Sequence, residues 1–292
     1  SGNIDNLPTS IDIAGIGVKL GKGFSIFAGK QCTAYGGIEF DLNPIEIYEY
    51  SDMIENMSNF MTGLNIGYDI NAHQQLNLQI LDSRNGSFNK TYGVETEDGE
   101  QPTIESGKLP LVYTLNWNGN FNDVFKTRWS ASIMNEAKDK NLYYFAFGNE
   151  LNLNKFNMFL DFMYSKEGID RKGIMTGITG SMEGHNAFDA GYFSMVTKLN
   201  YRFLPKWNAF VKGMYETASL TKQQGDLEKG KYRTAWGYFA GVEFYPMDTN
   251  LHFFLTYVGR SYDFTARAKA LGQENYSTNR VSVGFIYQLP MF

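Results

Sequence analysis

The chain has 292 residues, a formal net charge of −5, three histidines and one cysteine. The negative charge argues against a nucleic-acid partner held by phosphate neutralisation, and Cys32 alone cannot form an internal disulfide. No apolar run is long enough for a transmembrane helix, and the histidines are too scattered for a metal site. We therefore predict no metal and no cofactor.

Alternating apolar and polar residues recur along the chain in segments of about 9 to 12 residues, the length with which a tilted strand crosses a bilayer. In one segment Phe156, Leu160 and Phe162 share a face opposite Asn157 and Asp161. A period of two is typical of a strand with one face in an apolar medium. The thirteen predicted strands lie near residues 10–20, 23–31, 58–70, 73–82, 110–119, 126–137, 141–151, 155–166, 190–202, 206–217, 232–246, 250–262 and 277–289.

The connections between these strands are short turns and long loops that nearly alternate. The long ones are 32–57, 83–109, 167–189, 218–231 and 263–276. Short turns at one end and long loops at the other are typical of outer-membrane barrels, whereas a soluble β-sandwich has no reason to segregate them. We therefore predict an all-β fold, a single antiparallel transmembrane β-barrel domain over residues 1–292 that lies in a lipid bilayer.

The tight turn from Lys138 to Lys140 is the exception, because a long loop is due there. The strand count is odd as well, whereas single-chain bacterial barrels usually have an even number of strands and periplasmic termini. We expect at least one further strand before Ser1, giving about 14–16 strands in the full chain. The terminal Phe292 resembles the signal by which outer-membrane barrels are recognised for insertion.

The segment 32–57 alternates poorly and is acidic, and no Lys or Arg occurs from Gln31 to Ser83. Long ordered loops are usually functional, so we interpret this segment as a loop that folds into the barrel and narrows it. A surface loop with a short helix near residues 48–56 is the alternative. The predicted pore-constriction residues are Glu39, Asp41, Glu46, Glu49, Asp52 and Glu55.

Charged residues within the predicted strands fall on the face opposite the apolar one. The predicted lumen-facing charges are Arg128, Asp161, Lys198, Arg202, Lys212 and Arg260, accompanied by Asp69, Glu216, Glu243 and Arg280. We expect some loop acids to pair with Arg128, Lys198 or Arg202, because burying many like charges unpaired is costly. The remaining carboxylates predict a modest cation preference.

Three short motifs resemble the region after an early strand in the phosphate-selective porin O and P family: Gly29-Lys30-Gln31, Gly36-Gly37 and Asn43-Pro44. The Asn- and Tyr-rich composition is similar to that of members from the Bacteroidota. The resemblance implies a water-filled barrel of about sixteen strands, often trimeric, in the lipopolysaccharide-containing outer membrane of a Gram-negative bacterium. Anion-selective members line their channel with a series of arginines. No such cluster is present here, so phosphate selectivity is not carried over.

The leading functional hypothesis is a passive porin, in which a charged constriction biases the diffusion of small hydrophilic solutes or ions. The alternative is a non-transport barrel, a scaffold or accessory subunit in a complex with other outer-membrane proteins. An outer-membrane hydrolase is a third hypothesis, but the sequence contains no nucleophile elbow and no helical zinc motif. We predict no catalytic residues.

Overall fold

The computed structural model describes residues 11–84, 86–94, 104–181, 184–247 and 251–287. The strands are β1 (Ala14–Gly21), β2 (Phe24–Cys32), β3 (Phe60–Asn71), β4 (Gln74–Asp82), β5 (Ser106–Phe121), β6 (Phe125–Ala137), β7 (Lys140–Leu153), β8 (Phe156–Ile169), β9 (Phe188–Leu204), β10 (Trp207–Leu220), β11 (Gly230–Phe244), β12 (Leu251–Phe264) and β13 (Tyr276–Tyr287). The helices are α1 (Ile38–Asp41), α2 (Pro44–Ile47), α3 (Asp52–Glu55), α4 (Phe88–Tyr92), α5 (Ile174–Thr179) and α6 (Ala266–Ala270).

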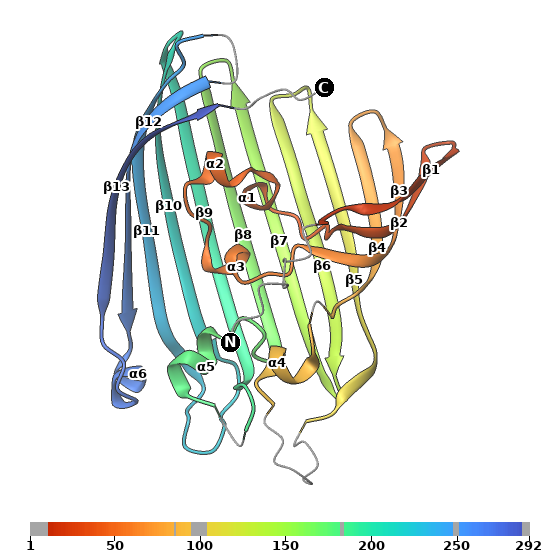
Figure 1. Cartoon of the computed structure of the whole chain (residues 1–292), viewed down its shortest axis with the longest axis vertical. Coiled ribbons are helices and arrows are strands. Elements are labelled where there is room, and N and C mark those ends of the chain that lie inside the picture. Colours follow the sequence, from red (N-terminus) through yellow and green to blue (C-terminus); the bar gives the residue numbers. More distant parts are fainter. Residues whose placement is uncertain (1–10, 85, 95–103, 182–183, 248–250, 288–292) are drawn as a thin grey trace, which may run out of the picture.

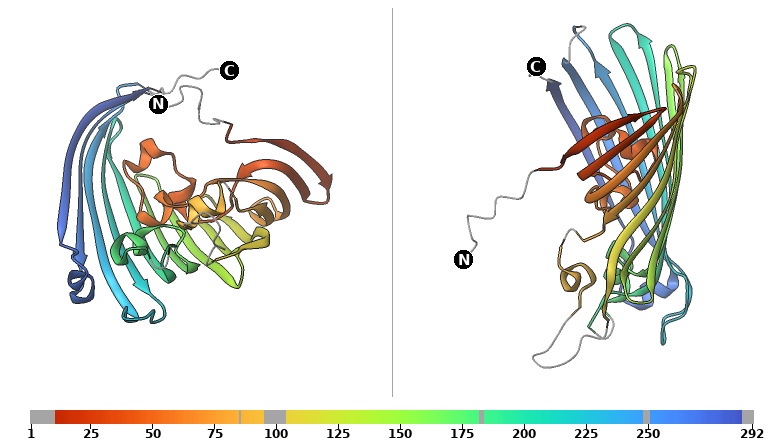
Figure 2. Two further views of the ribbon diagram at one scale, coloured as in Figure 1. Left: turned by 60° about the horizontal axis from the view of Figure 1, so that its bottom comes forward. Right: turned by 90° about the vertical axis from the view of Figure 1, so that its right-hand side faces the viewer.

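The thirteen strands form one curved antiparallel sheet in which each strand pairs with its neighbours in sequence (Figure 1). This confirms the predicted all-β class and the predicted order of strands. Within the described residues no ladder joins β1 to β13, and the two edges stand apart in Figure 2. The expected total of about 14–16 strands stays a prediction, and Phe292 lies outside the described residues.

The two ends of the sheet carry different connections. The long connections with α4, α5 and α6 lie at the lower end in Figure 1, and the short hairpin turns lie at the upper end. The exception predicted at Lys138 to Lys140 is present, since β6 ends at Ala137 and β7 begins at Lys140. No helix in the described part of the chain is long and apolar enough to cross a membrane.

Burial alternates along the strands as the sequence predicts. In β8 the outward-facing Phe162 is 37% exposed, whereas its neighbour Asp161 is fully buried on the inner face. In β5 Leu115 is exposed and Thr114 is buried. The outer face of the sheet is therefore apolar and exposed, as a surface in contact with lipid requires.

This face assignment predicts unequal effects of arginine in β8. Leu160→Arg should destabilise the protein by about 2–4 kcal/mol, because the charge would enter the apolar band of the membrane. Asn157→Arg should cost far less, because Asn157 lines a polar cavity on the inner face. Urea unfolding in lipid vesicles measures both free energies, and equal costs at the two positions would contradict a membrane location for β8.

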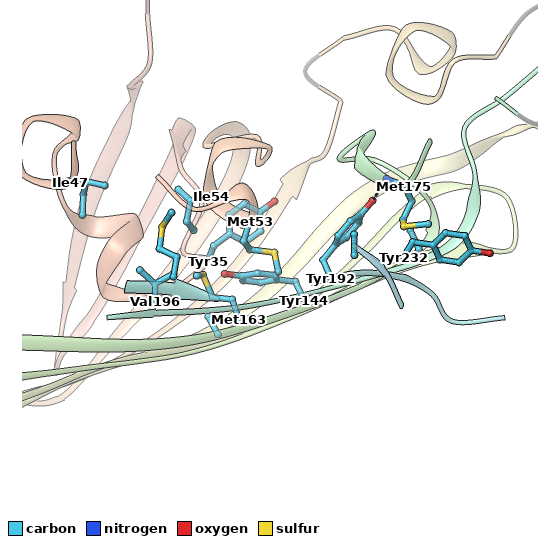
Figure 3. Close-up of a cluster of buried hydrophobic side chains, with 14 of the residues drawn as sticks. Tyr35, Ile47, Met53, Ile54, Tyr144, Met163, Met175, Tyr192, Val196 and Tyr232 are labelled. Atoms are coloured by element: carbon cyan, nitrogen blue, oxygen red, sulfur yellow. Dashed lines mark hydrogen bonds between the residues drawn. The ribbon is translucent and has the colours of Figure 1, made fainter. Parts of the chain in front are cut away.

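The connection between β2 and β3, residues 33–59, carries α1, α2 and α3, and we call it the inner loop. It lies against the concave face of the sheet, between its two ends (Figures 1 and 2). Its apolar side chains Ile47 and Met53 are buried with Tyr144, Met163 and Val196 of the strands (Figure 3). The main apolar core thus lies between the inner loop and the sheet, and it holds the loop inside the curve.

Candidate functional site

Just before α1 the inner loop has two glycines with positive φ, Gly36 (φ 66°) and Gly37 (φ 86°), which turn the chain into the helix. α2 follows a capping box in which the Asn43 side chain accepts a hydrogen bond from the backbone N–H of Ile45 at 3.1 Å. The Glu46 carboxylate accepts from the backbone N–H of Asn43 at 3.2 Å. These local signals stop the loop from continuing as a strand.

α1 is fixed to the sheet by a carboxylate of β8. Asp161 accepts hydrogen bonds from the backbone N–H groups of Ile38 at 2.9 Å and Glu39 at 2.7 Å. Gly148 of β7 allows this approach, since a Cβ atom there would lie 2.7 Å from Cα of Gly37. The predicted lumen-facing Asp161 therefore holds the backbone of the inner loop, and its carboxylate is not open to the lumen.

The most buried ion pair joins Glu39 of α1 to Lys212 of β10. Lys212 Nζ lies 2.6 Å from Glu39 Oε1, and both side chains are 0% exposed. Lys212 also donates to the Glu49 carbonyl at 2.7 Å, and Ser51 donates to Glu39 through its backbone N–H and its hydroxyl. One lysine thus binds the loop at α1 and again beyond α2.

A second cluster forms around Arg260 of β12. Its guanidinium lies 2.7 Å from Glu216, 2.9 Å from Asp52 and 3.3 Å from Glu49. Arg233 of β11 also pairs with Asp52. Two arginines of the sheet therefore compensate Asp52, the first residue of α3, and Arg260 also compensates Glu49 just before the helix.

Two further pairs are more open to solvent. Arg128 Nε lies 2.8 Å from the Asp41 carboxylate, which is one of the pairings expected from the sequence. Arg280 of β13 approaches Glu49 at 3.5 Å. These pairs lie on opposite sides of the inner loop, so the loop contacts cations from β6 to β13.

Lys198 and Arg202 do not form the expected ion pairs with loop acids. Lys198 donates to the backbone carbonyl of Glu46 at 2.5 Å, and Arg202 lies 5.2 Å from the centre of the Tyr245 ring. Among the described residues no ion pair reaches the carboxylates of Glu46 or Glu55. The structure therefore divides the six predicted constriction acids into four compensated and two uncompensated ones.

The other two predicted lumen acids lie apart from these clusters. Asp69 is near the short-turn end of β3 and accepts a hydrogen bond from Gln75 at 2.8 Å. Glu243 of β11 accepts from the hydroxyl of Tyr48 at 2.7 Å and from the side-chain amide of Asn208 at 2.8 Å. Glu243 therefore anchors the end of α2, while Asp69 does not contact the loop.

Sequence reasoning missed Arg233, Ser51 and the Tyr48 hydroxyl as contacts. A signal existed for Arg233, because it lies an even number of residues from Glu243 in the same predicted strand. Both side chains are therefore expected on the same face, and Glu243 is predicted to face inward. Another signal was the apolar inner face of β7 to β10, where residues such as Phe159 interrupt the polar pattern of a lumen wall. Strands with apolar residues on both faces indicate that a segment of the chain packs against the inner face of the sheet.

Tyr50 shows how burial affects a titratable group of the loop. Burial, together with the nearby carboxylate of Glu39, raises its pKa to about 12. The hydroxyl therefore stays neutral and donates to the Leu42 carbonyl at 2.7 Å. This bond ties the segment before α3 to the segment before α2.

Two large cavities flank the inner loop. One, of about 560 Å³, lies toward the short-turn end and is lined by residues that include Glu46, Asn157 and Arg202. The other, of about 440 Å³, lies between the loop and β12–β13, where Glu55 and Arg280 line it. Both are polar openings beside the loop. No group of His, Cys, Asp and Glu within the described ranges could hold a metal ion.

Comparisons with known proteins agree with this architecture. The sequence model of a family described as phosphate-selective porin O and P matches residues 1–289. No curated protein sequence matches the chain.

Among solved structures, a loop deletion mutant of OmpT, an outer membrane protein of Vibrio cholerae, is 10% identical with a TM-score of 0.53. The alignment covers 93% of this chain and 77% of that chain. Acinetobacter baumannii OccAB3 is 12% identical with a TM-score of 0.51, over 93% of this chain and 65% of that chain. OccAB2 of the same organism is 12% identical with a TM-score of 0.52, over 95% and 67%. At these identities the likeness concerns the fold, and this chain spans about two thirds of the length of the Occ structures.

Proposed function

Because the chain belongs to the phosphate-selective porin O and P family of the bacterial outer membrane, we propose that it is a porin for passive diffusion of small hydrophilic solutes. The observation that carries this proposal is the inner loop, which buried cations hold against the wall while polar cavities stay open on both sides of it. A loop fixed inside a polar barrel narrows the channel without closing it. This is a non-enzymatic function.

Solute flux tests the proposal directly. Vesicles that contain the complete protein should swell when placed in iso-osmotic solutions of small hydrophilic solutes, at rates that fall steeply with solute size. A scaffold barrel would leave the vesicles as tight as protein-free controls, and that result would reject the porin. No contact in the described residues specifically favours the scaffold alternative.

We also propose that Glu46 and Glu55 set a modest cation preference. Their carboxylates have no ion pair in the described structure, and each lines one of the two cavities. Unpaired charges in a low-dielectric channel raise the local counter-ion concentration, and salt screens this effect. The sequence predicts this role for those of the six acids that stay unpaired, and the lack of an ion pair at Glu46 and Glu55 among the described residues supports these two.

The double substitution Glu46→Gln and Glu55→Gln should therefore shift the reversal potential in a KCl gradient toward chloride, and most strongly at low salt. Glu105→Gln is the matched control, because Glu105 is an exposed residue beside Lys138 and outside the inner loop. An unchanged reversal potential in the double variant at low salt would remove these two acids from the account of selectivity.

The assembly of the porin is a separate proposal. A homotrimer, or association with other outer-membrane proteins, follows from the family resemblance. Chemical cross-linking in native membranes tests it, since a trimer would give products of three times the chain mass.

A further inference from the structure

Four rings follow the inner face from the loop toward the short-turn end of the sheet. Tyr48 lies 5.4 Å from Phe254, Phe254 lies 6.5 Å from His252, and His252 lies 5.1 Å from Tyr245, measured between ring centres. All four side chains are half-buried, so part of each ring is accessible. They form a continuous track of rings beside the loop.

A row of carboxamides runs across the sheet beside this track. Asn200 of β9 donates to Asn157 of β8 at 3.2 Å, and Asn208 of β10 donates to Asn200 at 3.3 Å and to Glu243 of β11 at 2.8 Å. Each carboxamide offers two donors and an acceptor oxygen with two lone pairs. Asn157 also donates to Glu150 and Asn152, so both N–H groups of Asn157 and of Asn208 are used. Within the described part of the chain, one N–H of Asn200 and lone pairs on the three carboxamide oxygens are left for another molecule.

Two rings of the track, Tyr245 and His252, meet the row in the cavity of about 560 Å³, which Asn157, Asn200 and Asn208 also line. The Nε2 atom of His252 is buried and has no hydrogen-bond partner among the described residues. The volume lies within the range of sites for small organic molecules. The cavity thus combines accessible rings with polar groups that can both donate and accept.

Three charged groups of this cavity, Glu243, Lys198 and Arg202, already have partners, whereas Glu46 has no ion pair with any residue that the structure describes. Glu243 accepts from Tyr48 and Asn208, Lys198 is bonded to the Glu46 carbonyl, and Arg202 lies over an aromatic ring. The cavity lining also holds equal numbers of acids and bases, namely Glu46, Glu150 and Glu243 against Lys155, Lys198 and Arg202. These opposite charges balance in number, so the unpaired Glu46 leaves only a modest preference for cations and no strong field for a simple ion.

We propose that this cavity is a binding subsite for neutral saccharides on their way through the porin. Sugars present an apolar C–H face that packs on aromatic rings, and hydroxyl groups that both donate and accept hydrogen bonds, as carboxamides do. The inference rests on the proposed porin function and deepens it by naming the solute class. A single hexose or a disaccharide suits the size of the cavity.

Channel current tests this inference. With the complete protein in a planar bilayer in KCl, added maltose should reduce the current in a saturable way. A polyethylene glycol of similar mass should reduce it only in proportion to its concentration. If maltose behaves like the polyethylene glycol, or if inorganic phosphate saturates and maltose does not, the saccharide subsite is rejected. Absence of any KCl current would instead reject the porin, and calorimetric titration of the detergent-solubilised protein with maltose would then decide the subsite.

Two variants locate the site. Tyr245→Leu removes a ring of the track and Asn200→Ala removes a carboxamide, and each should raise the half-saturating maltose concentration about tenfold, which corresponds to about 1.4 kcal/mol. Tyr238→Leu is the matched control, because Tyr238 is exposed on the outer face of β11 and should leave maltose binding unchanged. Heat-modifiable mobility on gels verifies that each barrel is folded. Wild-type half-saturation in both folded cavity variants would overturn the assignment.

Discussion

Replacing Lys212 with Met should lower the free energy of unfolding by about 3–5 kcal/mol, because it leaves the carboxylate of Glu39 buried without its cation. Both side chains of this pair are completely buried, so water cannot compensate the lost charge. Lys212 also holds the Glu49 carbonyl, so the substitution frees the loop at a second point. Urea titration in lipid vesicles measures the loss of stability, and single-channel recording should show a larger, noisier conductance.

Two matched variants distinguish the cost of the unpaired buried carboxylate from the general effect of replacing a lysine with methionine. Lys138→Met breaks an ion pair whose two members are both exposed, and it should leave stability unchanged. Glu39→Gln combined with Lys212→Met removes both charges and should recover most of the stability, because the residual cost comes from the unpaired charge. A double variant that is as unstable as Lys212→Met would show that the pair is not what fixes α1.

Replacing Arg260 with Met should have an effect of similar size, about 3–5 kcal/mol, but with a different consequence for the pore. Arg260 is 4% exposed and Glu216 is 2% exposed, so Glu216 would lose its ionic partner inside the barrel. Asp52 would keep Arg233, and Glu49 would keep the more exposed Arg280 at 3.5 Å. We therefore expect loss of stability together with a shift of the reversal potential toward cations.

Arg267→Met is the control, since Arg267 of α6 pairs with the exposed Glu228 of the β10–β11 connection, outside the inner loop. Adding Glu216→Gln to Arg260→Met should restore stability, because no buried carboxylate is then left without a cation. The shift in reversal potential should persist, because Asp52 and Glu49 are unchanged. An Arg260→Met channel with wild-type stability and selectivity would show that this cluster holds neither the loop nor the charge balance.

The strands could be predicted from sequence because each of them repeats one physical constraint. Lipid on one side and polar groups on the other impose a period of two, which fixes both the strand and the direction of each side chain. The alternation of side chains along each strand was therefore enough to place Arg260 and Lys212 on the inner face. Strand ends were less accurate: β5 begins at Ser106 and not near residue 110, through an irregular pairing in which Ser106 faces Ala137.

The partners within the inner loop could not be predicted in the same way. Lys198 and Lys212 are both predicted to face inward, yet only Lys212 forms an ion pair with a loop carboxylate. That choice depends on the height of α1 above the sheet, which Gly148 and Asp161 set from strands distant in sequence. Periodicity carries no information on such contacts. The capping box at Asn43, by contrast, was visible in the sequence and could have predicted α2.

The same limit applies to charge. The sequence predicts that some of the six loop carboxylates pair with inward cations, but it does not show which; four of them meet cations from strands far along the chain. Buried charges are compensated because the alternative is costly. The excess of acidic residues in the sequence of the inner loop is therefore larger than the net negative charge that the loop presents in the folded pore.

The central claim is that the chain forms an open channel narrowed by the inner loop, and single-channel conductance tests it most directly. The two ends of the loop lie side by side, since the backbone N–H of Thr33 donates to the carbonyl of Asn59 at 2.9 Å. A short Gly-Ser turn can therefore replace residues 35–57 without separating β2 from β3. We predict a steady conductance for the complete wild-type protein and a clearly larger one for the variant without the loop. No conductance in either protein, or the same conductance in both, would contradict the account.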